Sequence, residues 1–269
     1  MTANAADDNF PVEPMQFFVG TSGYSYKEWK GSFYPDKLPQ KEMLSYYSER
    51  FSTVEINNSF YRMPGIDVVE SWAQQTPASF RFVLKAPQTI THRKRLKDAD
   101  EATDHLIQTA FILKERRGPL LFQLPPNFKK DLARLEAFLS MIANRTALVF
   151  EFRHESWFDD EVFDCLRSHS CALCVADSDE VPSVDVVSTS DCGYVRLRRE
   201  SYSDAALRKW IKRLRSQNWE EVYVFFKHED TASGPRLAAR FLELAGLTHP
   251  NKGQSGDSSI VAGKRSTPE

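Results

Sequence analysis

Short apolar segments alternate along the chain with longer segments of helical periodicity. The short segments are rich in β-branched and aromatic residues, which is the pattern of buried β-strands. Eight of them are expected to be strands, at residues 17–23, 52–59, 80–87, 119–126, 147–154, 171–177, 193–199 and 222–230. Strands that alternate with helices form a parallel sheet, and eight such units close a barrel. The pattern therefore predicts an α/β protein with a single (β/α)8 TIM-like barrel.

The longer segments carry apolar residues at the spacing of one helix face. Leu106 and Ala110 belong to one such stripe, and Leu207 and Ile211 belong to another. These stripes indicate helices that pack on the outside of the barrel. Residues 178–191, SDEVPSVDVVSTSD, contain a proline and no apolar stripe. The sixth helix of the barrel is therefore predicted to be reduced or absent.

The two ends of the chain differ from the rest. The whole chain of 269 residues is 41% hydrophobic and 27% charged, which suits a large globular domain. Its last twenty or so residues are polar and rich in glycine and serine, and its first residues show no strand or helix pattern. We expect a barrel domain over residues 16–248, with disordered tails over residues 1–15 and 249–269.

Charge and N-terminal composition limit the partners and the compartment. A formal net charge of -2 argues against a surface that binds nucleic acid over its whole extent, although a local basic pocket is compatible with it. The N-terminal segment lacks an apolar signal-like core, and no apolar run approaches the roughly 20 residues that span a bilayer. The four cysteines are few for this length. We expect a cytoplasmic protein with no membrane partner.

Cys171 and Cys174 have the CxxC spacing of redox and zinc sites. They fall in the predicted strand 171–177, where residues three apart point to opposite faces of the sheet. The sequence contains no second CxxC to complete a zinc site. Both cysteines are therefore expected to be small buried side chains.

Polar residues gather at the end of each predicted strand, where the site of a (β/α)8 barrel forms. Glu55 alternates with Val54 and Ile56, and Glu151 follows Phe150 in the same way. The apolar residues suit the helix-covered outside of the barrel, so the charged ones are predicted to point inward near its top. The candidate site residues are Glu55, Glu151, His154, Tyr24, Asn57, Lys85, Gln123, Arg153, Trp157, Asp177, Arg196, Arg198, Lys227 and His228.

Seven ordered motifs between residues 17 and 247 resemble the YecE-like family, also called domain-of-unknown-function family 72. The motifs are VGTSGYSYKEWKGSFYP, VEINNSFYRMP, FRFVLKAP, LLFQLPP, FEFRHESW, YVRLRRESY and FFKHED. The resemblance implies a TIM-barrel-like fold with a polar cavity at the strand ends, and it implies no established reaction. The form RLRRE…FFKHE differs from the RLHG…NN of many members, so Arg198, Lys227 and His228 make this cavity more basic.

Basic side chains outnumber acidic ones among the candidate residues if all of them point into one cavity. The basic residues are Lys85, Arg153, Arg196, Arg198 and Lys227, and the acidic residues are Glu55, Glu151 and Asp177. An excess of positive charge favours an anion, and arginine side chains suit phosphate or carboxylate. The expected partner is a small anionic ligand, phosphorylated or nucleotide-like. The alternative is that several of the basic side chains extend into solvent.

These residues favour an enzyme. We expect a hydrolase or lyase that acts on a phosphorylated substrate by general acid and base chemistry. Glu55 or Glu151 would be the base, and His154 would be the proton shuttle. The electrostatic clamp would consist of Arg153, Arg196 and Lys85. A structural alternative stays open for Glu151 and Arg196, because charges inside a barrel must be paired to be tolerated.

Two further functions fit the same residues. One is a non-catalytic module that binds an anion or nucleic acid with the basic cavity, with Tyr24 and Trp157 as aromatic walls. The other is a metal-dependent hydrolase or isomerase. Its ligands would come from Glu55, Glu151, Asp177, His154 and His228. Because the neighbouring arginines would repel a cation, we expect neither a metal nor a cofactor.

Overall fold

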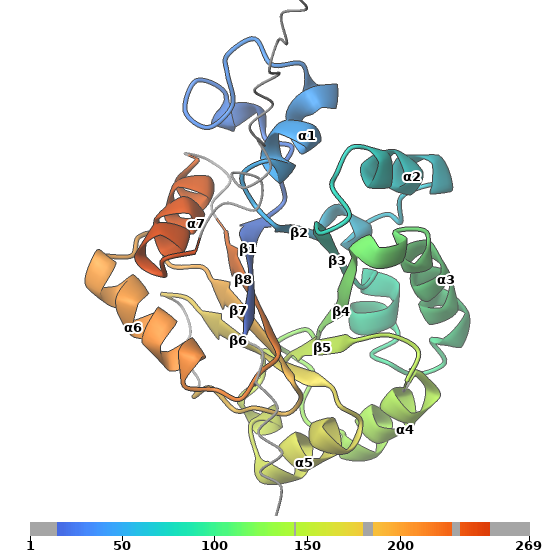
Figure 1. The fold of residues 1–269 in the computed structure, drawn as a ribbon. Coiled ribbons are helices and arrows are strands. Elements are labelled where there is room, and N and C mark those ends of the chain that lie inside the picture. Colours follow the sequence, from blue (N-terminus) through green and yellow to red (C-terminus); the bar gives the residue numbers. More distant parts are fainter. Residues whose placement is uncertain (1–14, 143, 180–184, 228–231, 248–269) are drawn as a thin grey trace, which may run out of the picture.

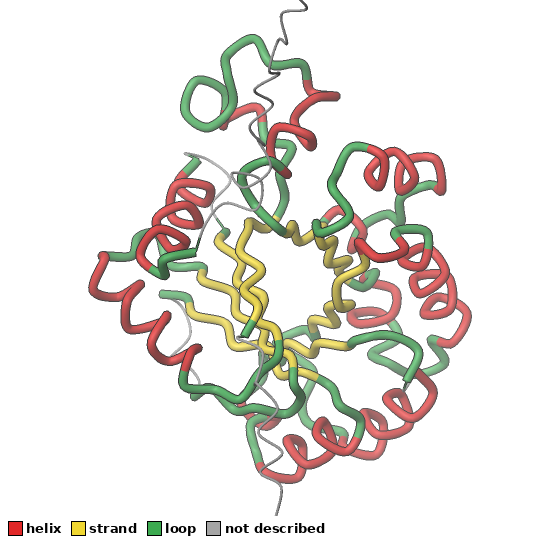
Figure 2. Tube along the Cα trace, in the orientation of Figure 1, coloured by secondary structure: helices red, strands yellow, loops and turns green. Residues whose placement is uncertain are grey.

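A closed barrel of eight parallel strands forms the centre of the molecule, as Figure 2 shows. The structure is a computed structural model, and it describes residues 15–142, 144–179, 185–227 and 232–247. The strands are β1 (Gln16–Ser22), β2 (Thr53–Ile56), β3 (Arg81–Lys85), β4 (Arg117–Gln123), β5 (Leu148–Glu151), β6 (Ala172–Asp177), β7 (Cys192–Leu197) and β8 (Glu221–Phe226). They pair in sequence order, and β1 also pairs with β8. The predicted (β/α)8 barrel is confirmed.

Helices surround the barrel, as Figure 1 shows. The α-helices of the described ranges are α1 (Met43–Ser48), α2 (Ile66–Gln74), α3 (Asp100–Phe111), α4 (Leu132–Ile142), α5 (Asp160–Ser168), α6 (Asp204–Arg215) and α7 (Ser233–Leu244). Between β6 and β7, residues 178–179 and 185–191 form no helix. The predicted loss of the sixth helix is confirmed for these residues. The predicted tails at 1–15 and 249–269 lie outside the described residues, apart from Met15.

Several short helices connect the strands to the α-helices. The 3-10 helices are η1 (Lys27–Trp29), η2 (Gln40–Glu42), η3 (Asn58–Phe60), η5 (Lys114–Arg116) and η6 (Glu155–Trp157), and η4 (Thr89–Arg93) is a π-helix. Two of them follow strand ends closely, since one residue separates η3 from β2 and three residues separate η6 from β5. Their short turns keep the chain close to the carboxyl ends of the barrel.

The strands separate two hydrophobic clusters. One lies inside the barrel and contains Cys174, Tyr194 and Phe225. The other lies between the strands and the helices and contains Cys171 and Phe150. Inward and outward residues therefore alternate along the strands as the sequence pattern predicted. Cys171 and Cys174 are both buried, on opposite faces of the sheet, which confirms the structural interpretation of this pair.

Strands β1 and β2 approach each other closely where a residue without a side chain is needed. A Cβ atom on Gly20 would lie 2.0 Å from the carbonyl oxygen of Thr53. The hydroxyl of Tyr47 donates to the same Thr53 carbonyl at 3.0 Å and accepts from the backbone N–H of Thr21 at 2.8 Å. Glycine at this position therefore leaves room for Tyr47 of α1 to connect β1 and β2 by hydrogen bonds.

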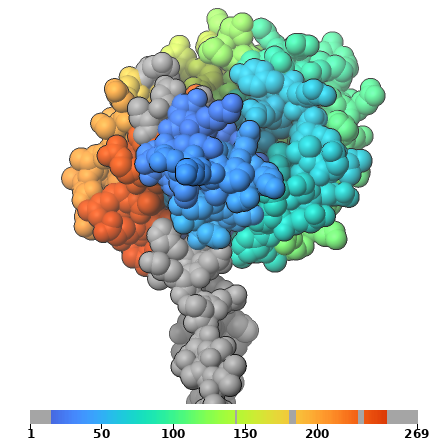
Figure 3. Space-filling view, turned by 90° about the horizontal axis from the view of Figure 1, so that it is seen from above, coloured from blue at the N-terminus to red at the C-terminus, as the bar shows by residue number. Residues whose placement is uncertain are grey.

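The segment between β1 and α1 packs through its aromatic residues and lies on the surface of the barrel, blue in Figure 3. Trp29 and Tyr34 are buried, with ring centroids 6.1 Å apart. The hydroxyl of Tyr34 donates to the carbonyl of Tyr24 at 2.5 Å. These contacts fix the start of the loop that follows β1 at the carboxyl end of the barrel.

Candidate functional site

Three charged side chains meet inside the barrel near the carboxyl ends of the strands. The guanidinium of Arg196 (β7) lies 2.7 Å from Oε1 of Glu55 (β2) and 2.5 Å from Oε2 of Glu151 (β5). The three side chains are only 2%, 0% and 1% exposed, respectively. Charges removed from water at such a cost are tolerated inside a protein only when opposite charges lie this close. The sequence placed these three residues inside the barrel, and the structure brings them together.

Glu55 has a partner for each of its oxygens besides Arg196. Its Oε1 accepts from Ser22 Oγ at 2.8 Å and from Asn57 Nδ2 at 3.1 Å, and its Oε2 accepts from Tyr194 Oη at 2.6 Å. Burial alone would raise the pKa of Glu55, but Arg196, Tyr194 and Ser22 outweigh it and lower the pKa. Glu55 is therefore an ionised carboxylate, saturated with hydrogen bonds.

Glu151 is surrounded by cations and by one amide. Gln123 Nε2, next to it in register on β4, donates to Oε2 at 2.8 Å. Arg153 Nη2 lies 2.6 Å from Oε1, and Arg198 Nη1 lies 3.9 Å from the same oxygen. Burial would raise the pKa of Glu151, but Arg196 and the other two arginines lower it to about 2.

Carboxylates with lowered pKa values are poor proton acceptors near neutral pH, because a good general base has a pKa near the working pH. Both Glu55 and Glu151 are also fully buried behind their partners. Their geometry favours the internal ion-pair interpretation: the two carboxylates hold Arg196, and Glu151 also orients Arg153 and Gln123.

Lys85, the last residue of β3, lies beside this network without an ion pair. Its Nζ donates to Oε1 of Gln123 at 2.8 Å and lies 4.3 Å from the ring centroid of Phe60. Among the residues that the structure describes, no carboxylate comes within 4.0 Å of this nitrogen. Burial and the charge of Arg196 lower the pKa of Lys85 to about 8, against the opposing effect of Glu55 and Glu151.

The outer edge of the network is cationic and partly open to solvent. The side chains of Arg153 and Arg198 are 22% and 20% exposed. We call Lys85, Arg153 and Arg198 the cationic rim. In the described ranges, Nε of Arg153 and Oδ1 of Asn57 are buried without a hydrogen-bond partner. Within that part of the chain, Arg153 of the rim thus combines positive charge with an N–H donor that still has hydrogen-bonding capacity, and Asn57 beside Glu55 has a free acceptor.

His154 and Trp157 follow β5 and differ in their surroundings. Nδ1 of His154 accepts from the backbone N–H of Ser156 at 3.1 Å, so this half-buried side chain caps η6. Trp157 is fully buried: its Nε1 donates to the carbonyl of Phe128 at 2.7 Å, and its ring stacks on Phe152 at 4.7 Å. Trp157 therefore packs in the hydrophobic core and does not form a wall open to a ligand.

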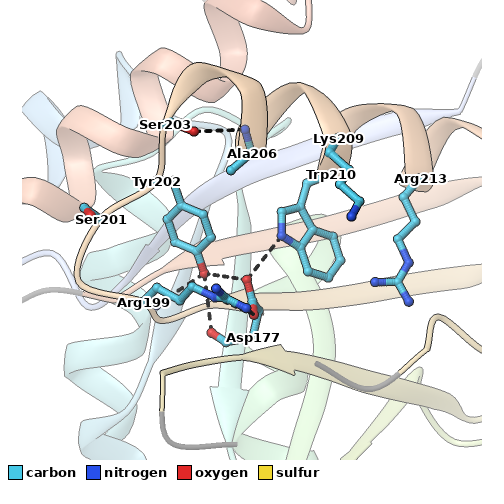
Figure 4. A pocket seen from close by; sticks show the side chains of 9 residues that line it. All are labelled: Asp177, Arg199, Ser201, Tyr202, Ser203, Ala206, Lys209, Trp210 and Arg213. Atoms are coloured by element: carbon cyan, nitrogen blue, oxygen red, sulfur yellow. Dashed lines mark hydrogen bonds and ion pairs between the residues drawn. The ribbon is translucent and has the colours of Figure 1, made fainter. Parts of the chain in front are cut away.

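Asp177 was expected in the same cavity, but the structure places it elsewhere. It is an outward residue of β6, since its neighbour in register is the buried outward Leu197. Its carboxylate accepts from Arg199 Nε at 2.8 Å, Tyr202 Oη at 3.0 Å and Trp210 Nε1 at 3.2 Å, as Figure 4 shows. Asp177 thus holds the start of α6 against the strand ends, outside the barrel.

A pocket of about 410 Å3 lies beside this second cluster. Its lining includes Tyr202, Trp210, Lys209 and Arg213 (Figure 4). Arg199 is not among the residues predicted from sequence, although it lies in the same RLRRE segment as Arg196 and Arg198. Adjacent strand residues point to opposite faces, so Arg198 turns toward the barrel interior and Arg199 turns outward to Asp177.

Tyr24 and Lys227 follow the ends of β1 and β8. Tyr24 is half-buried, and its ring packs 6.2 Å from that of Tyr47. Lys227 follows β8, and its backbone N–H donates to the carbonyl of Leu197 at 3.3 Å. His228 lies outside the described residues.

The described residues contain neither a candidate metal site nor a helix suited to span a membrane. Within the described ranges, no three His, Cys, Asp or Glu side chains are grouped so that they could hold a metal ion. The metal-dependent alternative therefore has no ligand set in that part of the chain. None of the helices described above is long and apolar enough to cross a membrane.

The fold and the site define a class of protein: a (β/α)8 barrel with a buried ion-pair network beneath a cationic rim. Residues 18–259 match the family described as "Protein of unknown function DUF72", and the chain belongs to this family. The family resemblance of the seven sequence motifs is thereby confirmed.

Curated proteins and solved structures agree with this assignment. The chain is 24% identical to the UPF0759 protein YunF of Bacillus subtilis (strain 168) over 229 residues, 78% of each chain. It is 33% identical to the UPF0759 protein YecE of Escherichia coli (strain K12) over 116 residues, 43% of each chain. A crystal structure of a DUF72 family protein from Thermotoga maritima is 26% identical, with a TM-score of 0.71 over 86% of this chain and 99% of that chain.

Proposed function

We infer that this protein is an enzyme that binds a small anionic substrate over the carboxyl ends of the strands. The observation that carries the inference is the uncompensated charge of the cationic rim. Lys85, Arg153, Arg196 and Arg198 are four cations grouped around the two carboxylates of Glu55 and Glu151. Four positive charges against two negative ones leave an excess of two. A bound anion would neutralise this excess.

The rim residues have the chemistry to bind phosphate or carboxylate. Guanidinium groups present several N–H donors in a plane, which suits two oxygens of one anion. Arg198 follows β7, and (β/α)8 barrels frequently bind phosphate near their seventh and eighth strands. These features support a phosphorylated or nucleotide-like substrate.

The buried network gives the rim a fixed position. Glu151 contacts Arg153 directly, and Arg196 fixes Glu151 from the opposite side. A binding group that is already oriented loses little entropy when the ligand arrives. We therefore assign anion binding to Arg153, Arg198 and Lys85, and we assign positioning of the rim to Glu55, Glu151 and Arg196.

Isothermal titration calorimetry with inorganic phosphate tests the anion site. We expect one site per chain, and we expect Arg153→Gln and Arg198→Gln each to weaken binding about tenfold, the equivalent of about 1.4 kcal/mol. Arg145→Gln is the control, because Arg145 pairs with Asp104 at the surface. Failure of the folded wild-type protein to bind phosphate, pyrophosphate or short oligonucleotides would contradict the proposal.

A non-catalytic anion-binding module is the rival function, and it uses the same rim. Incubation with a panel of phosphorylated and carboxylated small molecules, followed by mass spectrometry of the products, separates the two. The enzyme proposal requires that the wild type convert at least one of these anionic compounds and that Arg153→Gln lower this rate. Tight phosphate binding with no conversion of any anionic compound tested would favour the binding module.

A further inference from the structure

Lys85 differs from the other cations of the rim because its nearest partners are neutral. Arg153 and Arg198 both face Oε1 of Glu151, whereas the Lys85 ammonium faces an amide oxygen and an aromatic ring. Among the described side chains it has no carboxylate at ion-pair distance. A lysine in such surroundings loses its proton more easily than one in a salt bridge.

The orientation of the Gln123 amide is fixed by its two neighbours. An ionised carboxylate can only accept hydrogen bonds, so the NH2 group of Gln123 must face Glu151, and its oxygen must face Lys85. A neutral amine still has two N–H donors. Lys85 can therefore keep its hydrogen bond to Gln123 after deprotonation while its lone pair is directed elsewhere.

The surroundings of Lys85 also favour a neutral amine. Its side chain is half-buried and therefore partly shielded from water, which disfavours the charged form, whereas the face of Phe60 beneath Nζ favours the charged form. Burial, first, and Arg196, second, lower the pKa of Lys85 to about 8. With this pKa about one amine in ten is neutral at pH 7, compared with less than one in a thousand for an ordinary lysine. The neutral form is the one that attacks carbon.

The anion-binding arginines lie close to this amine through a short chain of contacts. Lys85 contacts Gln123, Gln123 contacts Glu151, and Glu151 contacts Arg153 and Arg198. A small molecule whose anionic group occupies the arginines can therefore present another of its atoms to Lys85.

We propose that Lys85 forms an imine with the carbonyl group of a small anionic aldehyde or ketone held by Arg153 and Arg198. This inference rests on the anion site proposed above and names the substrate class more closely. The neutral Nζ attacks the carbonyl carbon, a C–N bond forms, and the π electron pair moves to the oxygen, which takes one of the two protons of the now positively charged nitrogen. The resulting carbinolamine loses its hydroxyl, together with a proton from nitrogen, as water. One amine and one carbonyl give one imine and one water, with no oxidant or reductant.

Pyridoxal 5′-phosphate is a suitable probe, because it carries an aldehyde and a phosphate. The full-length protein is incubated with it, and sodium cyanoborohydride then reduces any imine to a stable secondary amine. Intact mass and peptide mapping report how many lysines react and which ones. We expect one rapid modification per chain, at Lys85, and a labelling rate at least fivefold lower when inorganic phosphate saturates the arginines.

Three variants complete the experiment. Lys85→Arg keeps the positive charge but removes the reactive amine, so rapid labelling should disappear. Arg153→Gln keeps the amine but weakens the anion site, so labelling of Lys85 should slow. Lys130→Arg is the matched control, because Lys130 pairs with Asp159 and Glu161 away from the rim. Its labelling should match the wild type.

The outcomes separate the imine from the anion site. If calorimetry detects phosphate binding but pyridoxal phosphate labels other lysines as fast as Lys85, the imine inference is wrong and the anion site stands. Labelling of Lys85 that neither phosphate nor Arg153→Gln slows would contradict the anion site, and the inference that rests on it.

Discussion

Arg196 and Glu151 form an ion pair in which both side chains are almost fully buried, and Glu151 also contacts Arg153 and Arg198 of the cationic rim. Such a pair is rarely the most stabilising arrangement for a protein interior, because two charges must be desolvated. Here the pair also holds a side chain of the proposed site in place. It fixes Glu151, whose other oxygen faces Arg153 and Arg198. The buried pair thus connects the core of the barrel to its proposed binding surface.

Glu151→Gln should destabilise the protein strongly. The substitution keeps the shape of the side chain but leaves Arg196 with a single carboxylate, Glu55, and it removes the counter-charge of Arg153. Breaking a buried ion pair from one side costs about 3–5 kcal/mol. Urea denaturation at pH 7 should detect this loss in the free energy of unfolding. Asp104→Asn, which breaks the exposed pair with Arg145, should cost less than about 1 kcal/mol.

The stability of the wild-type protein should fall in acid because of the same carboxylate. The pKa of Glu151 is about 2 in the folded state, against an ordinary value of 4.5. The stabilisation is fully present above pH 4.5 and is lost as the pH falls from there toward 2, because the unfolded chain takes up the proton first. The difference corresponds to about 3 kcal/mol. Denaturation series across this range should give a shallower slope for Glu151→Gln than for the wild type; equal slopes would assign the acid sensitivity to other groups.

Asp177→Asn should loosen the start of α6 without affecting the anion site. The carboxylate accepts from Arg199, Tyr202 and Trp210, and an asparagine has one oxygen to replace two. At least one donor would lose its partner, at a cost of about 1–3 kcal/mol. Phosphate affinity should match the wild type, because Asp177 lies outside the barrel. A loss of affinity as large as that of Arg153→Gln would show that the two clusters are coupled.

A side chain at Gly193, in β7, should destabilise the protein. A Cβ atom there would lie 2.2 Å from the ring of Trp219, which is buried against the outside of β7. Gly193→Ala should therefore lower the free energy of unfolding by about 1–3 kcal/mol through overpacking. Gly65→Ala is the matched control: its Cβ would meet only the end of the Asp67 side chain, which can move. Equal thermal stability of the two variants would contradict this expectation.

The barrel and its inward charges could be predicted from sequence because both depend on local alternation. Glu55, Glu151 and Arg196 each lie between apolar residues, and the period of a strand fixes the face on which they point. Asp177 and Trp157 could not be placed in the same way. Asp177 is one position out of phase with the inward residues of its strand and so lies on the outward face. Trp157 packs in the cluster between the strands and the helices, where its N–H donates to the carbonyl of Phe128, a residue distant in sequence.

The hydrogen-bond partners of Lys85 and its pKa could not be predicted from the sequence. Lys85 and Gln123 are 38 residues apart, and nothing in their spacing reveals that the amide separates the amine from Glu151. Burial and neighbouring charge decide the pKa of such a group, and both arise only when the strands close.

Arg198→Gln should raise the pKa of Lys85 from about 8. After burial and Arg196, the positive charge of Arg198 is a further influence that disfavours the protonated amine. Removing that charge favours protonation, so fewer neutral amines should be present at pH 7, and labelling by pyridoxal phosphate should slow. Reductive methylation with 13C-formaldehyde and NMR titration of the Lys85 signal would measure this pKa. Arg145→Gln, distant from the rim in its pair with Asp104, should leave it unchanged. A pKa that stays the same or falls in Arg198→Gln would mean that Arg198 does not act on the amine, and the proposed contact of both groups with one anion would lose its electrostatic basis.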